Sequence, residues 1–295
     1  MPAVTTAIAR APNEIATPTR ATSFDAAIGI CAAAALIVLP LAGSLATGAD
    51  LAALRLYWGA AEGWGIVVSV STLLLLSWLT ERQAVRGLAL VVFVFAGSVA
   101  LAPYVVPVLT PTPFNTLYLV APLAFVGLTR LLPGYDRSFG WLRRGRFTRG
   151  VIIAVVILAA AFVGSLFVYV KLLHPDLTHQ PVMSSHRFGG IALFAIGVGI
   201  AMLNAAVEEA ASRGILMQAL DAVFGSGIAP ILIQAVAFGA LHFNSTEPGI
   251  AGVVLTMLAG VVFGALRRAS RGILAPYIVH VAADIAVWTL GMSQL

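Results

Sequence analysis

The sequence predicts an all-α fold, a polytopic bundle of about eight or nine transmembrane helices, and two observations lead to this prediction. Hydrophobic residues make up 60% of the 295 residues and charged residues only 10%, whereas a soluble globular chain carries about 25% charged residues. The hydrophobic residues also form long runs that lack the alternating pattern of a transmembrane β-strand. Because a helix satisfies its backbone hydrogen bonds internally, these runs are expected to cross a membrane as helices.

Nine apolar segments are candidates for these spans. Two of them, residues 64–79 and 118–132, are shorter than the about 20 residues that cross a bilayer, so eight spans are an alternative. The first segment follows a long polar lead, which favours a retained helix over a cleaved signal sequence. The full set covers residues 26–47, 64–79, 88–109, 118–132, 151–170, 189–220, 228–243, 250–266 and 272–290.

The placement of arginine predicts the orientation in the membrane. Basic residues gather before the first span and after the second, fourth and eighth spans, and with nine spans these loops all lie on one side. The positive-inside rule makes that side the cytoplasm, so we expect a multi-pass protein of the cell (inner or plasma) membrane with a cytoplasmic N-terminus. The net charge of +5 arises in these loops and does not indicate nucleic-acid binding. The arginines concerned are Arg10, Arg20, Arg82, Arg86, Arg130, Arg137, Arg143, Arg144, Arg146, Arg149, Arg267, Arg268 and Arg271.

The densest basic loop covers residues 130–149 and contains six arginines. It is interpreted first as a topology anchor, with contact to anionic lipid or to an acidic substrate tail as the alternative. It also marks a boundary, because clusters of ionisable residues inside apolar segments occur only after it. The predicted organisation is a disordered tail over residues 1–25, accessory transmembrane helices over 26–150 and a core over 151–295.

Three clusters of ionisable residues interrupt the later apolar segments. An acidic or basic residue at the centre of a bilayer costs about 2.5–3.5 kcal/mol on insertion scales, so such residues usually mark function. Each cluster contains residues four positions apart, which share one face of a helix. The clusters are Glu208-Glu209 with Arg213, Phe238 with His242, and His280 with Asp284.

The chain around Gly225 is predicted to join two antiparallel helices. Glu208 and His242 lie equally far from Gly225 along the sequence. Because each helical residue rises by about 1.5 Å, the two side chains are expected at the same depth. A modest tilt of the last helix would bring His280 to them, so the clusters are predicted to meet inside the membrane.

The two neighbouring glutamates are expected to have different roles. Glu209 and Arg213 have the spacing of a helical ion pair, which would fix the helix. Glu208 is turned by about 100° from Glu209 and is then available for chemistry. A carboxylate out of bulk water is a stronger base, so Glu208 with His242 beside it is expected to hold or deprotonate a water molecule. The predicted reaction class is attack of this water on a peptide carbonyl.

His280 and Asp284 have two alternative roles at this point. They would stabilise a developing oxyanion, or bind a metal together with Glu208 and His242, since zinc accepts nitrogen and oxygen ligands. A serine or cysteine nucleophile finds no support, because no GxSxG motif occurs and the single cysteine, Cys31, is distant in sequence. The HExxH motif is also absent, which argues against a zincin-type site.

In their order, the three motifs resemble those of the CPBP family, which comprises CAAX prenyl endopeptidases and bacteriocin-processing proteins and is also called the Abi family. That family shows EExxxR, then FxxxH, then HxxxN or HxxxD on membrane helices, and the resemblance covers roughly residues 190–290. The resemblance implies an intramembrane endopeptidase core over 151–295, acting on a membrane-associated protein or peptide within the lipid bilayer. The implied roles are Glu208 as the water-activating base, His242 as its partner, His280 and Asp284 at the oxyanion, Glu209 and Arg213 as support, and Phe238 as a packing residue.

One position departs from the family pattern. The prenyl endopeptidases usually carry Asn where this chain has Asp284, and an Asn donates a hydrogen bond to an oxyanion whereas an ionised Asp does not. Asp284 must then be protonated, orient His280 or bind a metal. Members of the family have been described both as metalloproteases and as metal-independent glutamate proteases, so a zinc cofactor stays an alternative.

Two other functions remain open from the sequence. Buried Glu, His and Asp side chains also form ion or proton relays in transporters, although the inverted repeats of many transporters are not evident here. A non-catalytic membrane scaffold or immunity protein of the same fold is the other alternative.

Overall fold

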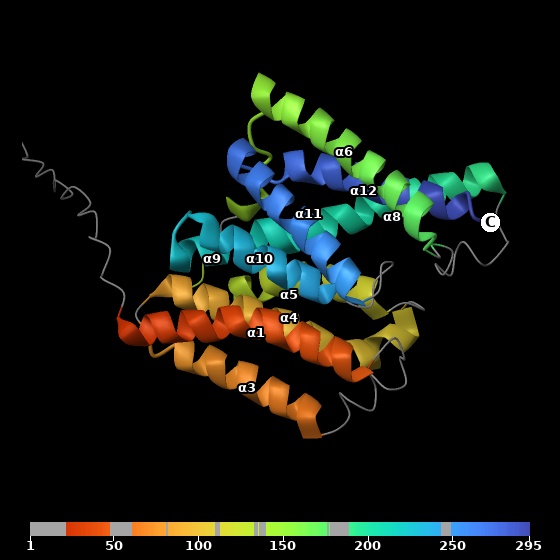
Figure 1. The fold of residues 1–295 in the computed structure, drawn as a ribbon. Coiled ribbons are helices and arrows are strands. Elements are labelled where there is room, and N and C mark those ends of the chain that lie inside the picture. The colour runs from red at the N-terminus through yellow and green to blue at the C-terminus, as the bar shows by residue number, and fades with distance from the viewer. Residues whose placement is uncertain are drawn as a thin grey trace, which may run out of the picture.

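The computed structural model describes residues 22–47, 61–80, 82–109, 113–132, 135, 140–175, 177, 189–242 and 249–295. Within these ranges the chain forms helices and no strand (Figure 1). The α-helices are α1 Ser23–Thr47, α3 Ala61–Ser77, α4 Gln83–Leu109, α5 Pro113–Leu131, α6 Arg149–Leu173, α8 Gly190–Glu209, α9 Met217–Phe224, α10 Ile228–Leu241, α11 Gly249–Ser270 and α12 Leu274–Met292, with a 3-10 turn η1 Gly140–Leu142 and a π-helix η2 Ala210–Leu216.

The all-α prediction is confirmed for the described residues, and each of the nine predicted spans coincides with a helix. Four helical stretches in these residues are long and apolar enough to cross a membrane: Arg149–Leu173, Gly190–Phe224, Ile250–Ser270 and Leu274–Met292. Shorter apolar helical stretches in these residues are Ser23–Val38, Val67–Ser77, Gln83–Gly97, Ala121–Leu131 and Ile228–Leu241. The protein is therefore a helical membrane protein, while the exact number of spans and the orientation stay predictions.

The first turns of two helices are fixed by hydrogen bonds between a side-chain oxygen and a backbone amide. The Oγ of Thr22 accepts a hydrogen bond from the Asp25 amide (3.1 Å), and an Asp25 carboxylate oxygen accepts one from the Thr22 amide (3.0 Å). This reciprocal cap begins α1 inside the predicted disordered tail, whose residues 1–21 lie outside the described ranges. Thr148 caps α6 with a single hydrogen bond, which its side-chain oxygen accepts from the Val151 amide.

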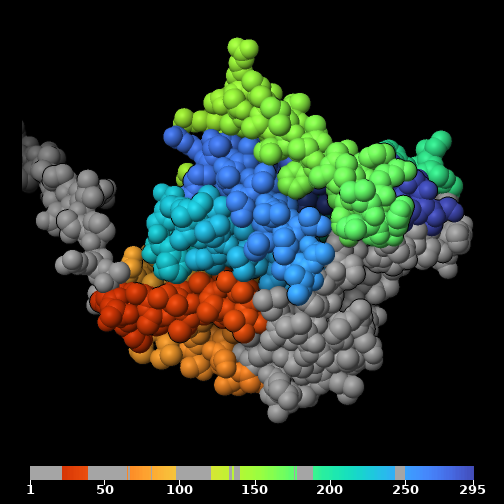
Figure 2. Space-filling model, viewed as in Figure 1, coloured from red at the N-terminus to blue at the C-terminus, as the bar shows by residue number. Residues whose placement is uncertain are grey.

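The helices are arranged in three groups (Figure 1). Helices α1, α3 and α4 pack together on one side, and α6 packs on α12 on the other. Between them lie α9, α10 and α11, with α10 in contact with α1, and the space-filling view shows α10 and α11 filling the space between α1 and α6 (Figure 2). Helix α10, which carries Phe238, is therefore central in the bundle, and α12, which carries His280 and Asp284, packs on α8 as well as on α6.

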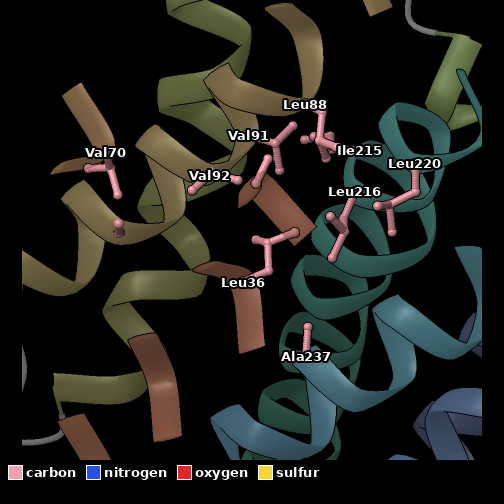
Figure 3. Close-up of a cluster of buried hydrophobic side chains, with 11 residues drawn as sticks. Leu36, Val70, Leu88, Val91, Val92, Ile215, Leu216, Leu220 and Ala237 are labelled. Carbon is pink, nitrogen blue, oxygen red and sulfur yellow. The ribbon is translucent and has the colours of Figure 1, made fainter. Parts of the chain in front are cut away.

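The largest apolar core joins the first helices to the π-helix. It contains Leu36 of α1, Val70 of α3, Leu88 of α4 and Ile215 of the π-helix, with Leu88 beside Ile215 and Val70 at the far side of the cluster (Figure 3). A second core lies between α6, α11 and α12 and contains Phe263. The predicted division into accessory helices and a C-terminal core stays a prediction, but the first core shows that α1, α3 and α4 support the helix next to the glutamates.

Small residues allow α10 and α11 to approach closely. A Cβ atom at Gly260 would lie 2.9 Å from the Ala235 Cα, and one at Gly239 would lie 2.6 Å from the Val253 carbonyl oxygen. Because neither contact leaves room for a side chain, α10 and α11 pack this closely only with glycine at these two positions. This approach brings α11 within reach of the site.

Candidate functional site

The structure brings the three predicted clusters together at one buried point. Glu208 and Glu209 end α8, Arg213 lies in the π-helix, His242 follows α10, and His280 lies in the first half of α12. The hairpin expected around Gly225 is formed, since α9 ends at Phe224 and α10 begins at Ile228. The convergence follows from this hairpin and from the packing of α12 on α8.

The ion pair predicted between Glu209 and Arg213 is present and is completely buried. Arg213 Nη1 lies 3.1 Å from Glu209 Oε1, and both side chains have 0% exposure. The guanidinium group lies over two aromatic rings, with its Cζ 4.2 Å from the centroid of Phe238 and 5.0 Å from that of Phe263. A cation held between a carboxylate and two ring faces is compensated both by charge and by the ring quadrupoles.

The same glutamate also holds His280, a contact that the sequence did not predict. His280 Nδ1 lies 2.9 Å from Glu209 Oε1, so this one oxygen joins Arg213 to His280. An ionised carboxylate only accepts, so the geometry assigns the hydrogen to Nδ1 and turns Nε2 toward the rest of the site. His280 Nε2 then lies 3.6 Å from Glu208 Oε2 and 3.5 Å from Asp284 Oδ1.

Glu208 presents one carboxylate oxygen between two imidazole rings. Its Oε2 is buried and has no hydrogen-bond partner in the described part of the chain. This oxygen lies 3.9 Å from His242 Nε2 and 3.6 Å from His280 Nε2. His242 Nδ1 is 2.7 Å from the Phe238 carbonyl oxygen, which accepts only, so Nδ1 carries the hydrogen and the lone pair of the neutral ring points from Nε2 toward Glu208.

Asp284 is held by Asn204, which lies with Glu208 and Ser212 on one polar stripe of an otherwise apolar helix, but whose contact with Asp284 was not predicted. Asn204 on α8 donates from Nδ2 to Asp284 Oδ2 at 3.1 Å, while Asp284 Oδ1 faces His280. Of the three roles left open for Asp284, this geometry favours orientation of His280. The available signal was the position of Asn204 one helical turn before Glu208, on the same face.

Two phenylalanines enclose the rings of the site. Phe263 stacks on His280 with centroids 5.1 Å apart and an interplanar angle of 29°. Phe238 lies 4.5 Å from the His242 ring and edge-on to His280 at 6.2 Å. The prediction that Phe238 packs in the site agrees with these contacts, whereas Phe263 gave no signal because it is one apolar residue in an apolar helix.

The helix that carries Arg213 differs from the prediction of a regular helix over 189–220. From Ala210 to Leu216 it is a π-helix, which places one extra residue in each turn. Gly214 faces Trp141 of η1, and a Cβ atom there would lie 3.0 Å from the indole ring and 3.3 Å from the Trp141 carbonyl oxygen. Such wide turns are frequent at functional sites, and this one follows directly after the two glutamates.

The arrangement does not form an evident metal centre. No group of three or more His, Cys, Asp or Glu side chains among the described residues is placed to hold a metal ion. The set predicted as alternative zinc ligands, Glu208, His242, His280 and Asp284, therefore lies together without forming such a group. Zinc stays an alternative cofactor.

The fold and the site define a helical membrane protein whose buried carboxylates and histidines meet within its apolar helices. Residues 190–286 match the family of Rce1-like proteins, described as type II CAAX prenyl endopeptidase Rce1-like. This match confirms the resemblance drawn from the motifs, and the matched segment contains all of the predicted site residues. No curated protein and no solved structure matched the chain.

Proposed function

We propose that the protein is an intramembrane endopeptidase that hydrolyses a peptide bond of a membrane-associated protein or peptide. The observation that carries the proposal is the buried Oε2 of Glu208, which faces Nε2 of both His242 and His280 at 3.9 and 3.6 Å. The match of this segment to a protease family supports hydrolysis over the other uses of buried carboxylates.

The first step is activation of a water molecule between Glu208 and His242. Both atoms that face each other, the carboxylate Oε2 and the neutral Nε2, accept hydrogen bonds. Two acceptors 3.9 Å apart are suited to one water molecule that donates to both. Glu208 takes a proton from this water as its oxygen attacks the carbonyl carbon of the peptide, and the proton later goes to the leaving amine.

His280 has the position of the group that stabilises the tetrahedral intermediate. When its ring carries both hydrogens, Nδ1 donates to Glu209 and Nε2 donates into the site. A donor fixed in place before the reaction stabilises the developing oxyanion without reorganisation. Asp284, held by Asn204, keeps the ring in this orientation.

The proposal is tested with the purified protein in lipid nanodiscs and a panel of lipid-anchored and transmembrane peptides. We expect cleavage at a defined bond, with one oxygen of the new carboxyl terminus derived from ¹⁸O-labelled water and detected by mass spectrometry. Absence of cleavage across the panel, together with a proton or cation flux in proteoliposomes, would favour the transporter alternative.

Replacement of Asp284 by Asn is expected to preserve cleavage within about tenfold of the wild-type rate. The amide oxygen of Asn still accepts the hydrogen bond from Asn204 and keeps the side chain in place, while the NH2 group replaces Oδ1 beside His280 and does not accept from the ring. Asp284→Leu removes this bond and the contact to His280, and its rate is expected to be much lower. Equal rates for the two variants would show that the Asn204 contact has no part in the reaction.

Removal of metal ions is expected to leave cleavage unchanged, because the proposed steps use only side chains of this chain. The measurement is the cleavage rate before and after dialysis against a strong zinc chelator, with the metal content determined in parallel. A rate that falls on dialysis and returns on addition of zinc would replace the glutamate mechanism with the metalloprotease alternative.

A further inference from the structure

Five arginines gather around one loop that the proposed function does not use. They are defined here as the arginine patch, and all five are exposed: Arg143, Arg144, Arg146, Arg149 and Arg271. No Asp or Glu occurs in residues 137–175 or in residues 248–283, which are the two segments that supply the patch. None of the five forms an ion pair with a carboxylate in the described ranges, so their charge is not neutralised there.

In contrast to the arginine patch, the neighbouring Arg267 and Arg268 both form ion pairs with a carboxylate. Arg267 Nη1 lies 3.0 Å from Asp221 Oδ2, and Arg268 Nη2 lies 2.7 Å from Asp221 Oδ1. These two side chains end α11 and fasten it to α9, so they have a structural partner. The five arginines of the patch have no such carboxylate partner in the described ranges.

The loop of the arginine patch is fixed to the turn between α11 and α12 by its backbone. The Arg146 amide donates to the Ser270 carbonyl at 2.7 Å, the Ile273 amide donates to the Arg143 carbonyl at 2.9 Å, and the Leu274 amide donates to that of Arg144 at 3.3 Å. Three hydrogen bonds between segments so distant in sequence hold the arginines in a fixed group.

The crossing of these two segments depends on two glycines. Gly145 has φ +89°, in the left-handed region that favours glycine, and a Cβ atom there would lie 2.7 Å from the Ser270 carbonyl oxygen. A Cβ atom at Gly272 would collide with the backbone of Arg144 and Gly145. The two segments can therefore lie against each other only because Gly145 and Gly272 lack a side chain.

The arginine patch lies at the ends of helices that are candidates for crossing a membrane. It lies where α6 begins, α11 ends and α12 begins, and all three helices are long and apolar enough to cross a membrane (Figure 1). Two apolar side chains next to the arginines are also exposed, Leu142 by 50% and Phe147 by 40%. Exposed apolar groups beside exposed cations are suited to the boundary between headgroups and acyl chains.

We propose that the arginine patch is a docking surface for the anionic headgroups of membrane phospholipids. Guanidinium groups bind phosphate oxygens in pairs of hydrogen bonds, and the backbone hydrogen bonds keep the segments that carry these arginines next to each other. The loop also touches the site from behind, because Trp141 packs on Gly214 of the π-helix and Leu274 begins the helix of His280. Lipid bound at the arginine patch therefore stabilises the loop that packs on the π-helix and on the start of α12.

The test uses the full-length protein in detergent, with binding of phosphatidylglycerol and of phosphatidylcholine measured by native mass spectrometry. We expect preferential binding of phosphatidylglycerol that weakens at high salt, and a rise of the melting temperature with this lipid only. The triple variant Arg143→Gln/Arg144→Gln/Arg146→Gln is expected to bind phosphatidylglycerol about tenfold or more weakly. These readouts do not depend on cleavage, so they separate this proposal from the proposed function.

Two further variants keep the test decisive. Arg82→Gln/Lys171→Gln/Arg187→Gln removes the same charge outside the basic loop and is expected to bind as the wild type does. Arg143→Lys/Arg144→Lys/Arg146→Lys keeps the charge and is expected to retain most of the preference for phosphatidylglycerol. This variant provides the test if the glutamine variant fails to fold. Equal binding of both lipids by the wild type, or wild-type binding by a folded glutamine variant, would overturn the proposal. Displacement of the lipid by millimolar glycerol phosphate would instead assign the surface to soluble phosphate and overturn the lipid assignment.

Discussion

Replacement of Glu208 by Gln is expected to lower the cleavage rate by at least about a hundredfold, because general-base catalysis contributes 10²–10⁴-fold. The amide has nearly the same shape as the carboxylate but does not accept a proton from water at neutral pH. Since the buried oxygen faces His242 and His280, the substitution removes the base and leaves the surrounding packing in place. The measurement is the single-turnover cleavage rate in nanodiscs, together with the melting temperature.

The matched control is Asp25→Asn, which makes the same chemical change at the cap of α1, far from the site in the sequence. This variant is expected to cleave at the wild-type rate with a small loss of stability. A folded Glu208→Gln variant that cleaves as fast as the control would remove Glu208 from the mechanism.

Replacement of Arg213 by Met is expected to have the largest effect on stability, about 3–5 kcal/mol, because it leaves the buried Glu209 without its cation. Both side chains are fully buried, so water does not compensate the carboxylate. The stacking of the guanidinium group between Phe238 and Phe263 is lost as well. Thermal unfolding in detergent, followed by circular dichroism, measures the change.

Two variants separate the effect of the uncompensated charge from the loss of packing. Arg213→Met/Glu209→Met removes both charges and is expected to recover part of the stability, although it also releases His280. Arg268→Met breaks a half-buried pair with Asp221 and is expected to cost much less. An Arg213→Met variant as stable as the wild type would contradict the assignment of this pair as the support of the site.

The sequence was sufficient to predict the helices and the approximate position of the site. Long apolar runs specify helices directly, so each predicted span coincides with a helix even though the ends differ by several residues. The equal distance of Glu208 and His242 from the turn at Gly225 was enough to predict that they meet. Helical spacing also predicted the ion pair of Glu209 with Arg213.

The contacts that the sequence did not reveal are those between helices. Glu209 bonds to His280 and Asn204 bonds to Asp284, and both contacts depend on how α8 and α12 are rotated against each other. Spacing along one helix carries no information on this rotation. Phe263 is positioned by the close packing of α10 and α11, for which glycines give only an indirect signal.

The change to a π-helix after Glu209 was also missed. The residues from Ala210 to Leu216 give no local signal that distinguishes a π-helix from an α-helix. The contact of Gly214 with Trp141 comes from a segment far away in the chain, so its effect on the helix appears only in the folded protein. The loop that carries the arginine patch is likewise fixed by hydrogen bonds to a distant segment, which the sequence alone does not show.

The central claim is that Glu208 and His242 act together on one water molecule. A double-mutant cycle of single-turnover cleavage rates with Glu208→Asp, His242→Gln and the combined variant tests it most directly, because residues that act as a unit have strongly non-additive effects. We predict that the combined variant is scarcely slower than the slower single variant. Rate losses that multiply in the combined variant would show that the two side chains act independently and would contradict the account.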